Sequence, residues 1–367
     1  MKTTNPSNLR QSQPSRPLRN VVCIVLLSIG MITPAIALKH APVEHHLKVD
    51  PAIPVWTPGD VKINPPEEEF NLVGADVMDE ITFGWAKLFR EAYSPKMSVT
   101  VEARASGAGA PGLVNGAHAA PVGRELMPAE VKLFVDKFGY KPFEIRVATG
   151  SVGSLGKTAT SVIFVDKENP IKGLTMEQVD AIYSKTRKRG HADITKWGDL
   201  GLTGEWASRP IHLYGLKPVN GIEQFIKMVA MQGGEYKENI EFVKGKGFVH
   251  AFNIAAEDMG KNKGGLTYAL LANLTPNVRV VPLAAKAGEP YYEPNLENVY
   301  SHKYPLSRYV YIYVNKKPGQ ALEPKVKEFL KMVLSRQGQE VVAREGVYIP
   351  LTPEVVREEL AKLEKVD

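Results

Sequence analysis

The stretch from Ala103 to Gly116 reads ARASGAGAPGLVNG and joins a hydroxyl side chain to closely spaced glycines. Gly107 and Gly109 tolerate backbone angles that turn successive N–H groups toward one point, and Ser106 is placed to cap a helix that begins a few residues later. Such a turn at a helix N-terminus binds phosphate-like anions without a formal positive charge. The stretch therefore predicts an anion-binding turn, with an ordinary loop as the alternative.

A second glycine-rich stretch, from Gly150 to Thr158, is close in composition to the phosphate loop of nucleotide hydrolases. That loop requires a glycine five residues before Gly156, where this chain has Ser151. A strand pattern, rather than the required helix, follows Lys157. The spacing therefore argues against a nucleoside triphosphatase.

No set of catalytic residues assembles from the sequence. It contains neither G-x-S-x-G around a serine nor H-E-x-x-H. A lone histidine such as His118 or His250 is more often a structural residue than a base. His40, His45 and His46 could hold a metal, but no carboxylate or cysteine completes a ligand set. We expect no enzymatic activity, no metal and no cofactor.

The first 37 residues have the pattern of a secretory signal peptide. Basic residues precede an apolar run at 21–32, and a small-x-small cleavage pattern follows at Ala35–Ala37. The run is shorter than the roughly 20 residues that span a bilayer, so a permanent anchor is the weaker alternative. Cys23, the single cysteine, lies inside the run, so the cleaved chain would have no disulfide or thiolate site. We expect segment 1–37 to be removed and the protein to be periplasmic.

The formal charge of +6 owes much to this export signal, which contains basic residues and no Asp or Glu. The rest of the chain is nearly neutral, whereas a nucleic-acid-binding protein needs a clustered basic surface. A basic loop at 185–189 is typical of a solvated face. We therefore expect no nucleic-acid partner. Segment 38–69 is rich in Pro and His and lacks apolar periodicity, which predicts an extended N-terminal arm.

From residue 70 the chain alternates between strand and helix patterns, which is typical of an α/β fold. Consecutive strand-to-helix turns bring helix N-termini to one edge of a parallel sheet, where ligands bind. We expect strands at 70–74, 99–103, 145–148, 161–165, 211–214 and 309–314, strand or turn segments at 264–268 and 278–283, and helices at 78–93, 125–138, 175–184, 220–229, 324–335 and 353–363.

Four stretches carry a resemblance to a known family: ARASGAGAPGLVNGAHAAPVGREL, VIFVDKENPIKGLTMEQVDAIY, GGLTYALL and the segment from Tyr304 to Thr352. In this order they resemble the periplasmic phosphate-binding proteins of ABC-type importers, in the type II solute-binding superfamily. The resemblance implies an α/β type II periplasmic binding protein, with two α/β lobes joined by two crossing hinge strands and the ligand cleft between them. It places lobe 1 at 70–164 and 310–367 and lobe 2 at 165–309.

The resemblance also implies three ligand turns, at Gly74–Val77 and Ser106–Gly109 in lobe 1 and at Asn220–Ile222 in lobe 2. The ligand-binding residues carried over, with neighbours that could substitute for missing contacts, are Ser106, Gly107, Ala108, Gly109, Asp76, His118, Arg124, Tyr214 and Asn220.

The chain departs from the family's pattern at three places. Phosphate binders offer a hydroxyl in the first turn, where this chain has Asp76 or Val77, and an acidic acceptor for the phosphate proton, where it has His118. The arginine expected before the third turn is missing, and an arginine gives one of the stronger contacts to an oxyanion. Its replacement removes that contact unless Arg124 or Lys217 reaches in. Asp76 either lines the cleft or caps its own helix.

The resemblance implies an exported, non-enzymatic monomer that captures phosphate or a related oxyanion and passes it to the membrane permease of an ABC importer. Because the arginine and the acidic acceptor are missing, the alternative is a binding-protein fold reused for sensing, adhesion or another surface interaction. Loss of the acceptor should also blur the distinction between phosphate and sulfate, since only phosphate has a proton to donate.

Overall fold

The computed structural model describes residues 43–59, 69–93, 97–216, 221–243, 257 and 261–366. Several predictions concern residues outside these ranges, namely the signal peptide 1–37 with Cys23, and His40, Lys217, Asn220 and His250. Within the described ranges, no helix combines the length and the apolar character that crossing a bilayer requires.

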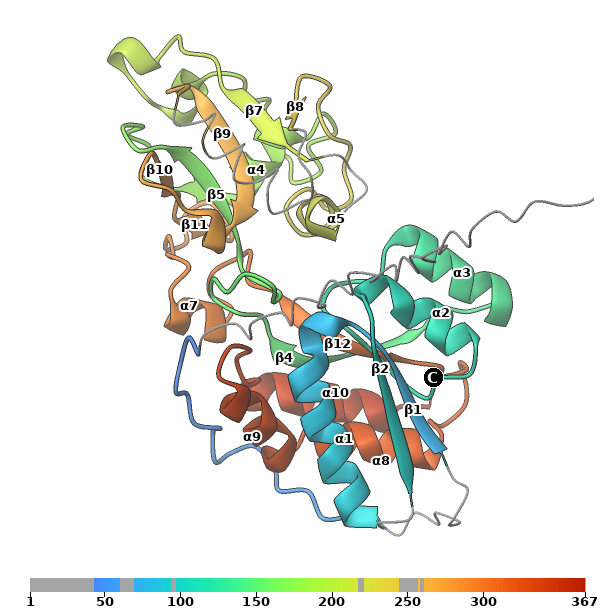
Figure 1. Cartoon of the computed structure of the whole chain (residues 1–367). Coiled ribbons are helices and arrows are strands. Elements are labelled where there is room, and N and C mark those ends of the chain that lie inside the picture. The colour runs from blue at the N-terminus through green and yellow to red at the C-terminus, as the bar shows by residue number, and fades with distance from the viewer. Residues whose placement is uncertain are drawn as a thin grey trace, which may run out of the picture. The chain divides into compact units, whose positions relative to one another are not determined.

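The first lobe contains two small sheets that meet at a bridge between Leu72 and Ala119. One sheet pairs β1 (Glu69–Gly74) with β2 (Ser98–Ala103) in parallel, and in the other β12 (Tyr309–Val314) lies antiparallel between β3 (Ala120–Val122) and β4 (Phe143–Thr149) (Figure 1). The parallel pair confirms the predicted pair of strand-to-helix turns. Both turns therefore lie at the same edge of the sheet.

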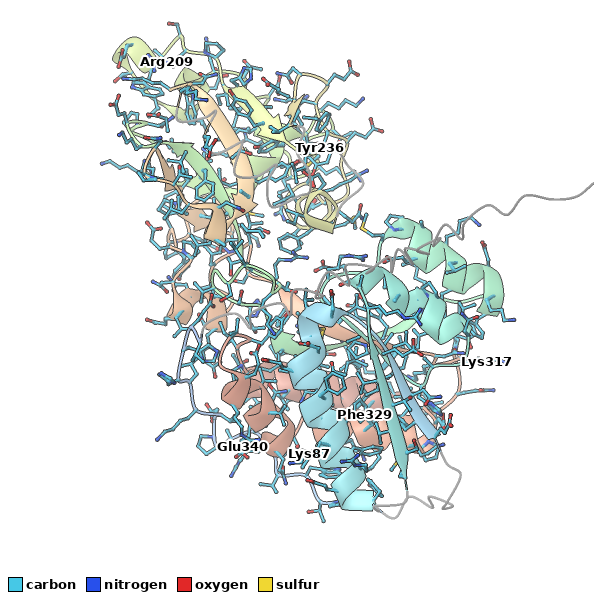
Figure 2. The ribbon with its side chains drawn as sticks, viewed as in Figure 1. Lys87, Arg209, Tyr236, Lys317, Phe329 and Glu340 are labelled. Carbon is cyan, nitrogen blue, oxygen red and sulfur yellow. The ribbon has the colours of Figure 1, made fainter. Side chains whose placement is uncertain are left out.

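Helices α1, α8, α9 and α10 surround the main core of the first lobe, and α2 and α3 cover a smaller core. In α1 the apolar side chains of Ile81, Trp85 and Phe89 recur at helical spacing and are buried. Phe89 packs edge-on against Phe329 of α8, whereas Lys87 faces solvent (Figure 2). The bounds are α1 Asp79–Tyr93, α2 Gly109–Val114, α3 Pro128–Phe138, α8 Pro324–Val333, α9 Arg336–Glu345 and α10 Pro353–Glu364.

The second lobe is built on a five-stranded sheet in the order β10-β5-β9-β7-β8. Its central strands β5 and β9 are buried along their whole length, as the apolar run at 161–165 predicts. Helix α4 begins at Thr175, whose hydroxyl accepts the N–H of Gln178. The bounds are β5 Ser161–Asp166, β7 His212–Gly215, β8 Glu241–Phe242, β9 Gly265–Leu270, β10 Val278–Val280, α4 Met176–Tyr183 and α5 Gly221–Val229, with the short elements β6 Leu174–Thr175, β11 Leu283–Ala284 and α7 Leu296–Tyr300.

Two connections join the lobes: residues 150–160 lead from β4 to β5, and residues 301–308 lead from α7 to β12. The two connections touch, because the N–H of Gly150 donates to the carbonyl oxygen of Arg308 at 2.8 Å. The lobe boundaries expected from the sequence, 164/165 and 309/310, fall inside β5 and β12 and stay predictions.

The predicted helix at 125–138 begins later, at Pro128, because Glu130 returns to accept the N–H of Met127 and closes the first turn there. Helix α9 was not predicted, since Gly338 interrupts its pattern. That glycine is required, because a Cβ on it would lie 2.3 Å from the carbonyl oxygen of Met332. The indole N–H of Trp85 also donates to the carbonyl oxygen of Gly338 at 2.8 Å.

The described part of the N-terminal arm, residues 43–59, has no helix or strand and packs on the first lobe. Ile53 is fully buried in the main core of that lobe. The indole N–H of Trp56 donates to Glu328 at 2.7 Å, and the backbone of Trp56 exchanges two hydrogen bonds with the amide of Gln337. The arm is therefore anchored by apolar burial and by side-chain hydrogen bonds.

Candidate functional site

A cavity of ≈ 310 Å³ lies where residues of both lobes and both connections meet. The first lobe contributes two polar or charged residues, the two connections contribute three, and the second lobe contributes a glycine and two apolar residues. The lining residues are Val77, Ala105, Ser106, Gly107, Gly123, Arg124, Lys157, Thr158, Ala159, Gly221, Ile222, Leu270 and Arg308.

Ser106 lies three residues after the end of β2, at the start of a 3₁₀ turn (Ser106–Ala108) that runs into α2. The prediction that its hydroxyl caps this helix is wrong. The hydroxyl oxygen instead accepts the N–H of Gly123 at 3.3 Å, which ties two cavity walls together. The first N–H groups of a helix have no partner within it, so the backbone of Ser106 and Gly107 presents donors beside the cavity.

The other two residues of this turn face elsewhere. Ala108 lines a separate depression over β1 and β2. Gly109 is buried against β3, where a Cβ would lie 2.6 Å from Cγ2 of Val122. Gly109 is therefore needed for the packing of α2, so the structure gives no support to its predicted contact with an anion.

Arg124 lines the cavity, and its guanidinium forms a two-pronged ion pair with Glu130 of α3, at 2.7 and 2.8 Å. Its aliphatic stem meets the second lobe, since a Cβ on Gly221 would lie 2.5 Å from Cδ of Arg124. Gly221 thus lets α5 approach the arginine.

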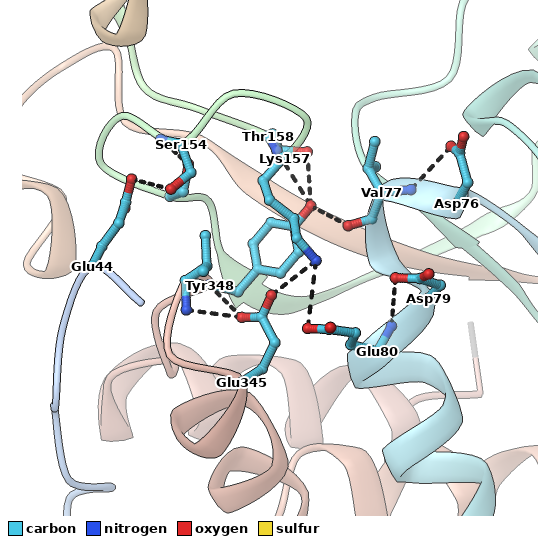
Figure 3. A network of polar contacts seen from close by, with 12 residues as sticks. Glu44, Asp76, Val77, Asp79, Glu80, Ser154, Lys157, Thr158, Glu345 and Tyr348 are labelled. Atoms are coloured by element: carbon cyan, nitrogen blue, oxygen red, sulfur yellow. Dashed lines mark hydrogen bonds and ion pairs between the residues drawn. The ribbon is translucent and has the colours of Figure 1, made fainter. Parts of the chain in front are cut away.

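Lys157 and Thr158 of the first connection form another wall (Figure 3). The Lys157 side chain is only 6% exposed, and its ammonium pairs with Glu345 at 2.9 Å and with Glu80 at 3.9 Å. The Thr158 hydroxyl donates to the carbonyl oxygen of Gly123 at 2.5 Å. The sequence did not predict either residue as part of an anion site, because the glycine spacing of this stretch differs from that of a phosphate loop.

Tyr348 holds this wall in place (Figure 3). Its hydroxyl donates to the carbonyl oxygen of Val77 at 2.9 Å and accepts the N–H of Thr158 at 3.2 Å. Burial raises the pKa of the Tyr348 hydroxyl, so it stays protonated and remains a donor. The tyrosine thereby links Val77 and Thr158, two residues that line the cavity.

Arg308 provides the third cation and was also missed. Its side chain is 5% exposed, and its guanidinium carbon lies 4.6 Å from the ring centre of Phe225 in α5. One guanidinium nitrogen pairs with Glu125 at 3.4 Å, whereas its Nε has no hydrogen-bond partner among the described residues. An unsatisfied buried donor carries a free-energy cost. Arg308 immediately precedes the apolar strand β12, and this charged residue next to an apolar strand was the sequence signal that could have indicated a site residue.

The three cations Arg124, Lys157 and Arg308 line the cavity, and no carboxylate does so among the described lining residues. Each cation forms an ion pair with a carboxylate: Arg124 with Glu130, Lys157 with Glu345 and Arg308 with Glu125. All three cations are therefore paired, and the surroundings of the cavity are close to neutral. Such an arrangement binds an anion through directed hydrogen bonds more than through net charge.

The structure does not bring Asp76, His118 or Tyr214 to this cavity. Asp76 accepts the N–H of the next residue, Val77, at 3.0 Å (Figure 3), but the N-cap of its 3₁₀ turn is Ala75 and no side chain caps that turn, so the alternative that Asp76 caps its own helix is not borne out. The His118 ring stacks on Phe70, and its Nδ1 accepts the N–H of Asn71 at 3.0 Å. Tyr214 is buried within the sheet of the second lobe. Asn220 lies outside the described residues.

The chain was compared with known proteins. A family model described as a PBP superfamily domain matches residues 63–337. The phosphate-binding protein PstS of Pseudomonas aeruginosa is 36% identical over 317 residues, which cover 86% of this chain and 92% of that protein. PstS of Staphylococcus saprophyticus is 25% identical over 243 residues, covering 65% of this chain and 66% of that protein.

Solved structures with a similar fold include PstS from Borrelia burgdorferi, with a TM-score of 0.49 at 16% identity, covering 78% of this chain and 100% of that one. An ABC-type phosphate transport receptor from Vibrio cholerae has a TM-score of 0.48 at 18% identity, covering 77% of this chain and 99% of that one.

Proposed function

Because the chain belongs to the PstS family of phosphate-binding proteins, within the PBP superfamily, we propose that it captures inorganic phosphate outside the cytoplasm. It then delivers the anion to the permease of an ABC importer. The relatives are named as binding proteins, and binding rather than turnover is the activity proposed for this chain. The observation that carries the proposal is the set of polar and cationic residues Ser106, Arg124, Lys157 and Arg308 that line one cavity.

Arg308 supplies the contact that the arginine missing before the third turn would have made. It reaches the cavity from the second connection, and its Nε is a donor that a bound oxyanion would satisfy. A guanidinium offers several N–H groups in a fixed plane, which matches the oxygens of a tetrahedral anion. Phosphate would thus relieve the unpaired buried donor of Arg308 as it binds.

The second lobe offers a different kind of contact. Gly221 and Ile222 at the start of α5, together with Leu270, form an apolar wall facing the donors. This wall excludes water and so strengthens the hydrogen bonds from the first lobe. Closure of the two lobes around the ligand is the movement expected of the fold.

Selectivity between phosphate and sulfate is expected to be modest. The described lining residues include the hydroxyls of Ser106 and Thr158 but no carboxylate to accept a phosphate proton. A carboxylate acceptor rejects sulfate, because sulfate has no proton to donate and its charge would be repelled. We therefore propose that the cavity binds both anions. The ratio of phosphate affinity to sulfate affinity should be smaller than in a site that has a carboxylate.

Titration calorimetry tests the proposal. The purified protein is unfolded and refolded to strip bound ligand, and phosphate and then sulfate are titrated at low and physiological salt. Saturable binding of one phosphate per chain is expected, weakened in Ser106→Ala and unchanged in Ser98→Ala, a matched change at an exposed position of β2. Absence of heat with both anions, from a protein shown to be folded, would overturn the proposal.

The proposal also includes export through a cleaved signal peptide and action as a monomer. Mass spectrometry of the exported protein would detect cleavage after Ala37, and light scattering would give its oligomeric state. An uncleaved chain retained in the membrane would contradict the first statement, and a stable dimer would contradict the second.

A further inference from the structure

The N-terminal arm makes a second attachment at Glu44, nine residues before Ile53. There the carboxylate of Glu44 enters the turn Ser151–Ser154 of the first connection (Figure 3). It accepts the N–H of Val152 at 2.9 Å and the N–H of Gly153 at 3.0 Å, and it also accepts the hydroxyl of Ser154. Three donors from one turn therefore converge on one carboxylate.

The turn is preshaped for this anion. The N–H of Ser154 donates to the hydroxyl oxygen of Ser151 at 3.2 Å, which holds the loop in a tight curve. Successive backbone N–H groups directed at one point form an anion-binding concavity. Here the chain fills the concavity with its own side chain.

Neighbouring residues keep Glu44 in register. The N–H groups of Glu44 and His45 both donate to the carbonyl oxygen of Gly346, at 3.0 and 3.2 Å. The His45 ring is buried and its Nε2 lies 2.9 Å from the carbonyl oxygen of Tyr348. The end of the arm is thus bonded to Gly346 and Tyr348, and the Tyr348 hydroxyl in turn contacts the cavity residues Val77 and Thr158.

The loop that receives Glu44 continues directly into the cavity wall. The N–H of Ser151 donates to the carbonyl oxygen of Thr158 at 2.8 Å, and the N–H of Thr160 donates back to Ser151 at 2.9 Å. These bonds join the two ends of the loop, so a shift of residues 151–154 displaces Thr158. Lys157 and Thr158, near the end of this loop, line the cavity.

We propose that the arm is an intramolecular strap, and that Glu44 is a positioning residue that sets the Lys157–Thr158 wall of the cavity. The strap joins the first lobe, through Ile53 and Trp56, to the connection on which the lobes turn. Its effect on ligand affinity rests on the proposed function, whereas its effect on the loop does not. Release of Glu44 would free the loop and leave the cavity less well ordered.

Amide hydrogen exchange of the ligand-free protein tests the strap without reference to a ligand. Glu44→Ala is compared with Glu340→Ala, which removes the same charge from an exposed position of α9. We expect faster exchange at Thr158 and Thr160, whose acceptors lie outside the arm, by about tenfold or more, and no change in the Glu340 variant. Exchange that rises only at Val152 and Gly153, the direct partners of Glu44, would overturn the proposal.

Phosphate titration of the same proteins then tests the consequence for binding. Glu44→Ala should weaken phosphate affinity by about tenfold, and Glu44→Gln should lie between it and the unmodified protein, because the amide oxygen can still accept one of the N–H groups. Equal affinities in all three proteins would overturn the positioning role. If the unmodified protein binds no phosphate, the proposed function fails, while the exchange result still decides whether the strap sets the loop.

Discussion

Two turns, one in the first lobe and one in the first connection, have backbone N–H groups that can receive an anion, and they differ in what lies beside them. The turn at Ser106–Gly107 opens into the cavity, with Arg124, Lys157 and Arg308 around it. The turn at Ser151–Ser154 is filled by Glu44, a carboxylate of the same chain. Backbone geometry alone therefore does not identify the ligand site.

The difference lies in what surrounds each turn. Three cations line the same cavity as the open turn, so a free anion there would gain charge-assisted hydrogen bonds. Around the filled turn, the donors to Glu44 are neutral N–H and hydroxyl groups. A tethered carboxylate fills such a turn without the loss of translational freedom that binding a free anion entails.

The largest effect is expected at Arg308. Arg308→Gln removes the guanidinium from the cavity and leaves Glu125 with the Tyr311 hydroxyl but without its ion pair, so phosphate affinity should fall by about 100-fold or more. Calorimetry measures the loss. Arg209→Gln is the matched control, since that guanidinium also lies over an aromatic ring, 4.2 Å from the centre of Trp206, but does not line the cavity. Similar losses in both variants would show that Arg308 acts through stability alone.

Lys157 should come next, with about a tenfold loss in Lys157→Met. This change also leaves Glu345, which is 3% exposed, without its buried ion pair, so the free energy of unfolding should fall by about 3 kcal/mol. Adding Glu345→Gln should restore stability but not affinity, as denaturant titration and calorimetry would show. Recovery of both would mean that Lys157 is a structural residue only.

Glu130 offers a change of opposite sign. Glu130→Gln breaks the ion pair of Arg124 but keeps an oxygen to accept the N–H of Met127. The freed guanidinium should raise phosphate affinity by roughly threefold at low salt, with less gain at high salt. Weaker binding in this variant would contradict the prediction. It would show that Glu130 is needed to position the Arg124 guanidinium, and that neutralisation of Arg124 by Glu130 does not limit phosphate affinity.

His302 should alter stability and leave binding nearly unchanged. Burial, reinforced by Arg146, lowers the pKa of His302 to about 4, so the folded protein holds it neutral while the unfolded chain takes up a proton below about pH 6.5. Stability should fall as the pH drops from about 6.5 toward 4, by up to about 3 kcal/mol from this group.

The control for that effect is His302→Asn, because asparagine tolerates the positive φ of 53° at this position. Denaturant titrations across this pH range should show a smaller loss of stability in the variant than in the unmodified protein. Equal pH dependence would exclude His302 as its source, and a large change in phosphate affinity would mean that the second connection acts on the cavity.

Local pattern predicted most of the elements, and particular residues show why. Ile81, Trp85 and Phe89 recur at the spacing of one helix face, which a sequence reveals directly. Helix α9 was not predicted, because a glycine inside a helix pattern lowers helix propensity. Only the structure shows that Gly338 is needed there for close packing against Met332 and for its contact with Trp85.

The site was predicted only in part. Ser106, Gly107 and Arg124 reach the cavity as expected, since the turn that holds them is local. Arg308 lies about two hundred residues from Ser106 in the chain, and only tertiary packing brings the two together. Gly109 and His118 have local roles, against β3 and Phe70, that the sequence could not separate from ligand binding.

A crystal structure of the protein with phosphate would test the central claim most directly. The account predicts one phosphate within hydrogen-bond distance of the Ser106 hydroxyl and the Arg308 guanidinium, with Glu44 still held by Val152 and Gly153. Phosphate in the Ser151–Ser154 turn in place of Glu44, with the cavity empty, would contradict both the assigned site and the distinction between the two turns.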